Sequence, residues 1–168
     1  MQKNKMDLIV INAKAGDPDA FTELIQFHMK DMYKAAIAIL MNDEDAADAI
    51  QETVLACWEK ISTLKKECYF KTWLIRILIN KCYDIRKNRE KQVSMEAYEE
   101  PYAEDVSNLT LKEALSQLDE KYRIVLMLYY GQGYRVSEIA DLLKIPKNTA
   151  QTRLDRGRKQ LKSYYSLD

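Results

Sequence analysis

Helix-breaking residues are scarce in this chain, and their scarcity constrains the fold more than any other feature. Only 4 glycines and 3 prolines occur among 168 residues, so few positions can interrupt a helix. Apolar residues recur at helical spacing, for example over 21–40 and 46–61, and no stretch alternates in the way that a half-buried strand does. We therefore predict an all-α protein.

The first ninety residues predict a helical bundle. Asp17 and Pro18 mark a helix start, because aspartate can cap free N–H groups and proline suits the first turn. We expect a short helix over 8–15, three longer helices and a loop over 62–68. The apolar positions expected inside are Phe21, Leu24, Ile25, Met29, Met32, Ala36, Ile39 and Leu40, then Ala46, Ile50, Thr53, Val54, Cys57, Trp58 and Ile61 in a helix over 44–61, then Phe70, Leu74, Ile77, Leu78 and Ile85 in a helix over 70–89.

The composition changes beyond these helices. Residues 91–108 include a run of glutamates and Pro101 without apolar periodicity, which is typical of a flexible acidic linker. We therefore divide the chain into an N-terminal domain over 1–90, this linker, and a C-terminal domain over 109–168. The expected architecture is two small helical domains joined by the linker.

Charge is segregated along the chain although the formal net charge is zero. Between Lys34 and Lys60 the charged residues are all acidic, whereas 65–91 and 144–162 are strongly basic. A neutral chain with separate acidic and basic blocks can hold different partners on different faces. The basic blocks keep a nucleic-acid partner open despite the neutral total.

Catalytic and metal-binding patterns are missing from the sequence. Cys57, Cys68 and Cys82 are widely spaced in apolar or aromatic stretches, and the lone His28 cannot complete a zinc set with them. We expect reduced core thiols, no metal, no cofactor and no enzyme activity. Without a phosphate-cradling Gly-x-x-x-x-Gly-Lys motif, no ATP is implied.

Apolar runs are too short for a signal peptide or a membrane span. The most apolar stretches, 35–41 and 124–130, fall well below the length that crosses a bilayer. We therefore expect a cytoplasmic protein without direct membrane insertion.

The segment over 137–154 fits a helix-turn-helix, preceded by expected helices over 109–117 and 119–131. Ser137 is the expected N-cap, and Lys144 occupies a turn position at which a left-handed backbone costs about 1 kcal/mol. The small core would hold Ile139, Leu143, Ile145, Ala150 and Leu154. The exposed face of a last helix, expected over 147–164, would present Lys147, Asn148, Gln151, Thr152, Arg153, Arg156 and Lys159. Such amides and guanidinium groups can contact base edges and phosphates, although an ordinary hairpin with a solvated basic face is the alternative.

Aromatic and basic residues interleave in the expected helix over 70–89. Tyr69, Trp73 and Tyr83 alternate with lysines and arginines, a pattern that holds single-stranded DNA by stacking and by charge. The alternative is that the large aromatics belong to the core. The pattern alone leaves both interpretations open.

Four stretches, taken in order, resemble extracytoplasmic-function (ECF) sigma factors, a group of the RNA polymerase sigma family. They are Ala13-x-x-Gly16-Asp17-x-x-Ala20-Phe21; Asp45-Ala46-Ala47-Asp48-Ala49-Ile50-Gln51-Glu52 with Trp58; Phe70-Lys71-Thr72-Trp73-Leu74 with Asn80 and Asp84; and Leu115-x-x-Leu118-Asp119 followed by the helix-turn-helix. The resemblance covers about 10–90 and 109–163. It implies a subunit that binds core RNA polymerase and directs promoter-specific initiation of transcription.

The resemblance also assigns residues to partners. Polymerase docking, at the clamp helices of the largest subunit, falls to Asp48, Gln51, Glu52 and Leu55. Capture of the melted minus-ten element falls to Tyr69, Lys71, Trp73, Arg76, Asn80 and Arg86. The duplex minus-thirty-five element falls to Lys147, Asn148, Thr149, Gln151, Thr152, Arg153 and Arg156. Relatives often carry Gly-Thr-Val-Lys-Ser-Arg in the last helix, so Asn148, Ala150 and Gln151 depart from the pattern. A cognate anti-sigma protein is a further partner that the resemblance implies.

A conventional helix-turn-helix regulator with a sensor domain is the main alternative. It would act without replacing the specificity subunit of the polymerase. Such a regulator needs neither an acidic face with an apolar centre over 48–55 nor an aromatic basic helix. These two features favour the sigma-factor interpretation.

Overall fold

The structure is a computed structural model that describes residues 2–93 and 106–165, and every regular element in these ranges is helical. The elements are α1 (Gln2–Lys14), α2 (Pro18–Leu40), α3 (Asp43–Lys60), the 3₁₀ turns η1 (Ile61–Thr63) and η2 (Glu67–Tyr69), α4 (Phe70–Val93), α5 (Val106–Ser116), α6 (Glu120–Leu126), the π turn η3 (Met127–Gly131), α7 (Val136–Leu143) and α8 (Lys147–Tyr165). The all-α prediction is confirmed.

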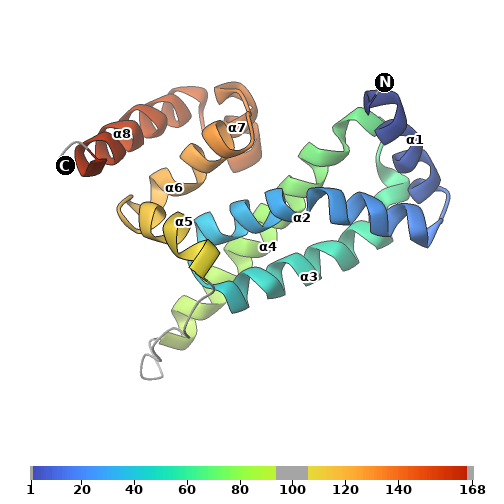
Figure 1. Cartoon of the computed structure of the whole chain (residues 1–168), viewed down its shortest axis with the longest axis horizontal. Coiled ribbons are helices and arrows are strands. Elements are labelled where there is room, and N and C mark those ends of the chain that lie inside the picture. Colours follow the sequence, from blue (N-terminus) through green and yellow to red (C-terminus); the bar gives the residue numbers. More distant parts are fainter. Residues whose placement is uncertain (1, 94–105, 166–168) are drawn as a thin grey trace.

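The helices α2, α3 and α4 form a bundle, and α1 packs on α2 at one end of it (Figure 1). Their shared core is apolar, with Leu24, Met32, Leu74 and Leu78 fully buried. Local signals set the helix limits as expected. The Asp17 carboxylate accepts from the backbone N–H of Asp19 at 3.0 Å, and Met41 ends α2 with φ of 53° before α3 begins.

Three residues expected in this core lie at the surface instead. Met29 is 39% exposed and Trp58 is 41% exposed. Trp58 lies in the last turn of α3, and its ring still packs with its centroid 5.0 Å from that of Phe21. Cys68 is exposed in η2, whereas Cys57 and Cys82 are buried as expected. The stretch expected to be a loop over 62–68 holds parts of η1 and η2.

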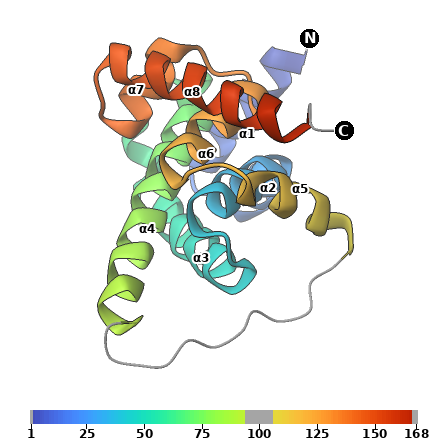
Figure 2. The ribbon, with the colours of Figure 1, turned by 90° about the vertical axis from the view of Figure 1, so that its left-hand side faces the viewer.

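The C-terminal helices form a smaller body, in which α8 packs against both α6 and α7 (Figure 2). Gly157 allows the close approach of α8 to α6, since a Cβ there would lie 2.9 Å from Leu126 Cδ1 and 3.1 Å from Tyr122 Cβ. Lys144 has φ of 56° and ψ of 46°, which confirms the expected left-handed turn between α7 and α8.

The expected N-cap of α7 at Ser137 is wrong. The helix begins at Val136, and Arg135 is its N-cap. The Glu138 carboxylate accepts from the backbone N–H of Arg135 at 3.0 Å and from its Nε at 3.0 Å. Both bonds run from Arg135 donors to the Glu138 carboxylate, and the first satisfies a free N–H at the helix start, so the helix begins two residues earlier than a cap at Ser137 would allow.

The two helical bodies touch each other. Helix α2 contacts α6 and η3, and α4 contacts α7. Buried residues from both bodies form one continuous apolar cluster. Most of the expected linker over 91–108 lies outside the described residues, with α4 ending at Val93 and α5 beginning at Val106.

Candidate polymerase and nucleic-acid interfaces

One face of α3 carries the residues assigned to polymerase docking. Asp48, Gln51, Glu52 and Leu55 follow helical spacing on one side of the helix, and all four are exposed. Leu55 is 65% exposed, which makes it one of the most exposed large apolar side chains in the described part of the chain. We call these four residues the docking face. An apolar centre within polar neighbours is the usual composition of a protein-binding surface.

Burial of the opposite face fixes the orientation of α3. Ala46, Ala49 and Thr53 are buried, and Thr53 Oγ1 donates to the Ala49 carbonyl at 2.6 Å. Cys57 is buried on the same side, and desolvation raises the pKa of its thiol to about 12. Because these positions are packed inside the bundle, the docking face on the other side of α3 points to solvent.

Some of the residues assigned to the minus-ten element are exposed to solvent, and others contact side chains within the protein. Tyr69 is 57% exposed, and Arg76 and Asn80 on α4 are also exposed. Trp73 is half-buried, with its ring centroid 6.0 Å from that of Phe70. Phe70 belongs to the core, as the alternative interpretation of the aromatic helix expects, while Tyr69 is open to solvent; binding of single-stranded DNA by this helix stays a prediction.

Two cations of α4 already have partners within the protein. Lys71 Nζ lies 3.3 Å from an oxygen of Asp31 and 5.5 Å from the centroid of the Tyr134 ring. The Arg86 guanidinium pairs with Glu120 of α6 and lies over the ring of Tyr83 at 5.0 Å. Lys71 and Arg86 are half-buried as a result.

The single histidine of the chain is buried close to Lys71 and Phe70. His28 is 6% exposed and packs between the rings of Phe27 and Phe70. Burial and then the neighbouring Lys71 charge lower its pKa to about 4. Among the described residues, no group of three histidine, cysteine or acidic side chains could hold a metal ion. His28 is thus a neutral core residue at neutral pH.

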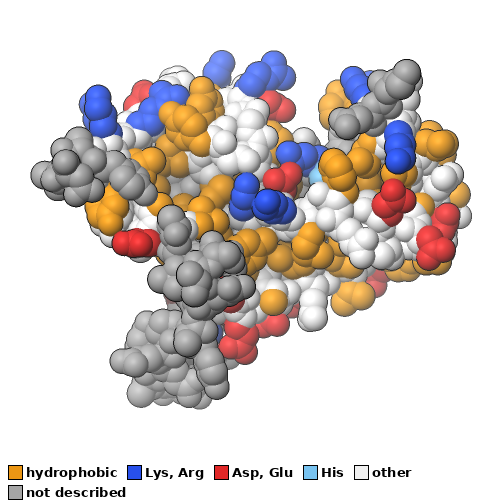
Figure 3. Space-filling view, in the orientation of Figure 1, with side chains coloured by type: hydrophobic (Ala, Val, Ile, Leu, Met, Phe, Trp, Pro, Cys, Tyr) orange, Lys and Arg blue, Asp and Glu red, His pale blue; other side chains and the backbone are white. Residues whose placement is uncertain are grey.

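The last helix presents a basic surface. Lys147, Asn148, Gln151, Thr152 and Arg156 are exposed on α8, and Lys and Arg side chains line the edge of the molecule formed by α7 and α8 (Figure 3). These side chains have the donors and acceptors that contact phosphates and base edges.

Thr149 and Arg153 on the same helix are half-buried rather than exposed. Arg153 lines a cavity of about 210 Å³ together with Tyr83 and Arg86 of α4 and Glu120 of α6. A residue expected to meet duplex DNA therefore lies partly turned toward the N-terminal body.

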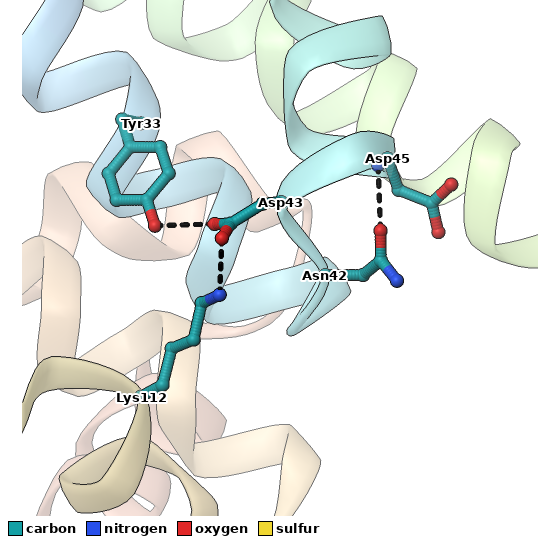
Figure 4. A network of polar contacts seen from close by, with 5 residues as sticks. All are labelled: Tyr33, Asn42, Asp43, Asp45 and Lys112. Atoms are coloured by element: carbon teal, nitrogen blue, oxygen red, sulfur yellow. Dashed lines mark hydrogen bonds and ion pairs between the residues drawn. The ribbon is translucent and has the colours of Figure 1, made fainter. Parts of the chain in front are cut away.

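A polar network between the two bodies was not anticipated from the sequence. Lys112 Nζ lies 2.6 Å from Asp43 Oδ2, and the Tyr33 hydroxyl donates to Asp43 Oδ1 at 2.6 Å (Figure 4). The Lys112 side chain is only 8% exposed, and lysine is rarely buried unless paired. Hydrogen bonds from these partners lower the pKa of Asp43 against the opposing effect of its burial. No local pattern joins residues 69 positions apart, so sequence reasoning had no signal for this contact.

Both bodies match family models. The model for sigma-70 region 2 matches residues 24–92, and the model for sigma-70 region 4 matches residues 108–161. The chain is 28% identical over 170 residues to the ECF RNA polymerase sigma factor SigW of Bacillus subtilis, covering 89% of this chain and 90% of SigW. It is 26% identical over 140 residues to the RNA polymerase sigma factor SigV of the same species, covering 80% and 84% of the two chains.

Solved structures share the fold. CnrH in complex with the cytosolic domain of CnrY has a TM-score of 0.71 at 24% identity, covering 97% of this chain and 98% of CnrH. The sigma factor RpoE of Bartonella quintana, in complex with the anti-sigma factor NepR, has a TM-score of 0.76 at 22% identity, covering 88% and 98%. In the described ranges, no helix is long and apolar enough to cross a membrane.

The matched regions and the extent of the relatives together identify the family of this chain. Matches to region 2 and region 4 together span both helical bodies, and the relatives named above are matched over most of their own length. The chain belongs to the sigma-70 family as an ECF RNA polymerase sigma factor, a non-enzymatic subunit that directs the polymerase to promoters.

Proposed function

We propose that the docking face on α3 binds core RNA polymerase, at the clamp helices of its largest subunit. The observation that carries this proposal is the exposed Leu55, 65% open to solvent among Asp48, Gln51 and Glu52. Leu55 would supply desolvated apolar area, and the polar neighbours would set the orientation and speed the encounter.

Region 2 would also capture the melted minus-ten element. Tyr69, Arg76 and Asn80 are exposed and close to the start and middle of α4. A ring that stacks on an unpaired base contributes about 1–3 kcal/mol, and cations follow the phosphates. This surface would also include Trp73, Lys71 and Arg86 once their present contacts within the protein are broken.

Region 4 would read the minus-thirty-five element as a duplex. The exposed Asn148, Gln151 and Thr152 offer hydrogen bonds to base edges in the major groove. Lys147 and Arg156 suit phosphates. Thr149 and Arg153 would complete this surface. We infer domain limits of 1–90 and 109–168 around the linker 91–108.

The two weak DNA sites would act together. Once polymerase fixes the distance between the two regions, binding at one element raises the effective concentration of the other site at its own element. Promoter melting then needs no bond chemistry, because unpaired bases gain stacking partners that duplex DNA does not offer them.

A cognate anti-sigma protein is the expected inhibitor. Relatives of similar fold are bound to NepR or to the cytosolic domain of CnrY. The exposed Leu55 and Trp58 provide apolar area on α3 that such a protein could cover. An inhibitor seated there would compete directly with polymerase.

Two variants separate docking from promoter reading. Glu52→Lys should weaken binding to core polymerase in a pull-down and reduce transcription in parallel, while Glu23→Lys, an exposed change on α2, should do neither. Arg153→Ala should reduce promoter-dependent transcription and leave polymerase binding intact. Equal loss of both activities in Arg153→Ala, or full polymerase binding in Glu52→Lys, would overturn the assignment.

A further inference from the structure

A cavity of about 490 Å³ lies at the end of the bundle where α1, α2 and the turn η2 meet (Figure 1). Small-molecule sites in proteins usually measure about 300–1,000 Å³, so the volume suits a ligand of that kind. The surface of the cavity is mostly apolar, and no residue of the docking face lines it. We call it the η2 cavity. Its lining includes charged side chains of both signs, namely Lys3, Lys5, Asp7, Glu23, Glu67 and Lys71.

The side chain of His28 lines the η2 cavity with a polar atom that has no partner in the fold. The residue is 6% exposed, and its buried Nδ1 makes no hydrogen bond within the described part of the chain. Buried polar atoms are nearly always hydrogen-bonded, because an unsatisfied one lowers stability. A ligand with an amide group in the cavity would supply the missing hydrogen bond.

A reactive side chain lines the same cavity. Cys68 is exposed there, whereas Cys57 and Cys82 are buried. Burial raises the pKa of both buried thiols to about 12, which suppresses the thiolate that attacks disulfides. Of the three cysteines, Cys68 is therefore the one open to thiol–disulfide exchange.

We propose that Cys68 is a modification site for a small peptide disulfide, one half of which becomes bound to Cys68 and occupies the η2 cavity. The Cys68 thiolate attacks one sulfur of the disulfide, the S–S bond within the small molecule breaks, and a new S–S bond joins that sulfur to Cys68 Sγ. The other half leaves as a thiolate and takes up the proton that Cys68 has lost. Cys68 is oxidised and the departing half is reduced, so the exchange needs no further oxidant.

The lining of the η2 cavity favours a peptide thiol over an uncharged one. An amide of the peptide would bond to His28 Nδ1, the carboxylates would be attracted to Lys3 and Lys5, and the ammonium group to Asp7 and Glu23. Each exposed charge pair contributes little. The hydrogen bond and the charges together would hold the adduct in one place.

The modification would act on the minus-ten surface, and this step rests on the proposed function. Tyr69 follows Cys68 directly in the chain, and its backbone N–H donates to the Lys66 carbonyl at 3.1 Å. In so tight a turn, an adduct on Cys68 would lie close to the exposed Tyr69 ring that we assign to an unpaired base. Thiolation should therefore hinder capture of the melted element and leave the docking face on α3 open.

The exchange is tested on the full chain alone, without polymerase or DNA. The probe is glutathione disulfide in buffers with reduced glutathione, and intact-protein mass spectrometry measures the modified fraction. The matched control combines Cys68→Ser with Ser62→Cys, which keeps one exposed thiol but moves it to η1, outside the lining of the cavity. The equilibrium constant should be about 5-fold larger for the unaltered protein, the effect of one hydrogen bond.

A second probe separates the cavity from simple exposure. Hydroxyethyl disulfide has neither amides nor charges and should react equally with the unaltered protein and the control. Lys5→Glu should lower the constant for glutathione disulfide about 3-fold through repulsion of its carboxylates, and leave that for hydroxyethyl disulfide unchanged. Equal constants for glutathione disulfide in the unaltered protein and the control, or modification of Cys57 or Cys82 in the folded protein, would overturn the proposal.

The effect on promoters is measured with the purified glutathione adduct. It should bind core polymerase like the reduced protein, but initiate from a duplex promoter at least about 5-fold less often, as expected from the loss of one stacked base. Dithiothreitol should restore activity, and Cys68→Ser treated in the same way should stay fully active. Full transcription by the adduct would overturn the regulation. If Tyr69→Ala also transcribes normally, the minus-ten assignment fails, whereas the exchange measurement stands without it.

Discussion

Leu55→Ala is the sharpest test of the docking face. Leu55 is 65% exposed, and full burial of a leucine side chain contributes about 1.5–3 kcal/mol. The two-thirds still open to solvent therefore represent about 1–2 kcal/mol that polymerase binding would gain. Losing this area should weaken the affinity for core polymerase about 5- to 30-fold.

The assay is a fluorescence titration of labelled sigma factor with purified core polymerase. Leu8→Ala is the matched control, because Leu8 is 56% exposed on α1, away from the docking face. Both variants should keep their free energy of unfolding within about 0.5 kcal/mol, since alanine suits a helix and neither change opens a core cavity. Unchanged affinity for Leu55→Ala, or an equal loss for Leu8→Ala, would refute the reasoning.

Three further changes test the fold. Burial holds the pKa of His28 near 4 against an ordinary 6.5, so stability should be full above about pH 6.5 and decline as the pH falls toward 4, by up to about 3 kcal/mol. Chemical unfolding of His28→Gln at both pH values should show a weaker decline, and an equal one would contradict this. Lys144→Gly should raise the free energy of unfolding by about 1 kcal/mol, because glycine relieves the left-handed turn; a loss of stability would be inconsistent with that turn. Asp17→Ala should lower the melting temperature through loss of about 1 kcal/mol of helix capping, and no change would mean that the cap contributes nothing.

Most features set by neighbouring residues in the chain were predictable, and the N-cap of α7 is the exception. The cap at Asp17, the break between α2 and α3, and the left-handed Lys144 all follow from local chemistry, and the structure has each of them. Periodicity likewise placed the buried side of α3 correctly at Thr53 and Cys57. Four ordered motifs were enough to identify the family.

Features set by distant residues were not predictable. Trp58 and Met29 fit the apolar stripes of their helices but are 41% and 39% exposed, and a helical pattern does not say which residues of a stripe a neighbouring helix covers. Lys112 is the clearest case, because a lysine on a short helix looks like a solvated charge until Asp43 is brought to it by the docking of the two regions. The half-burial of Arg153 has the same origin.

The most direct test of the whole account is run-off transcription with core RNA polymerase on a library of genomic fragments, with and without this protein. Transcripts should appear only when the protein is present. Their start sites should lie at a fixed distance from one shared pair of sequence elements, a melted element near the start and a duplex element upstream. The same start sites with and without the protein, or starts that share no upstream element, would contradict it.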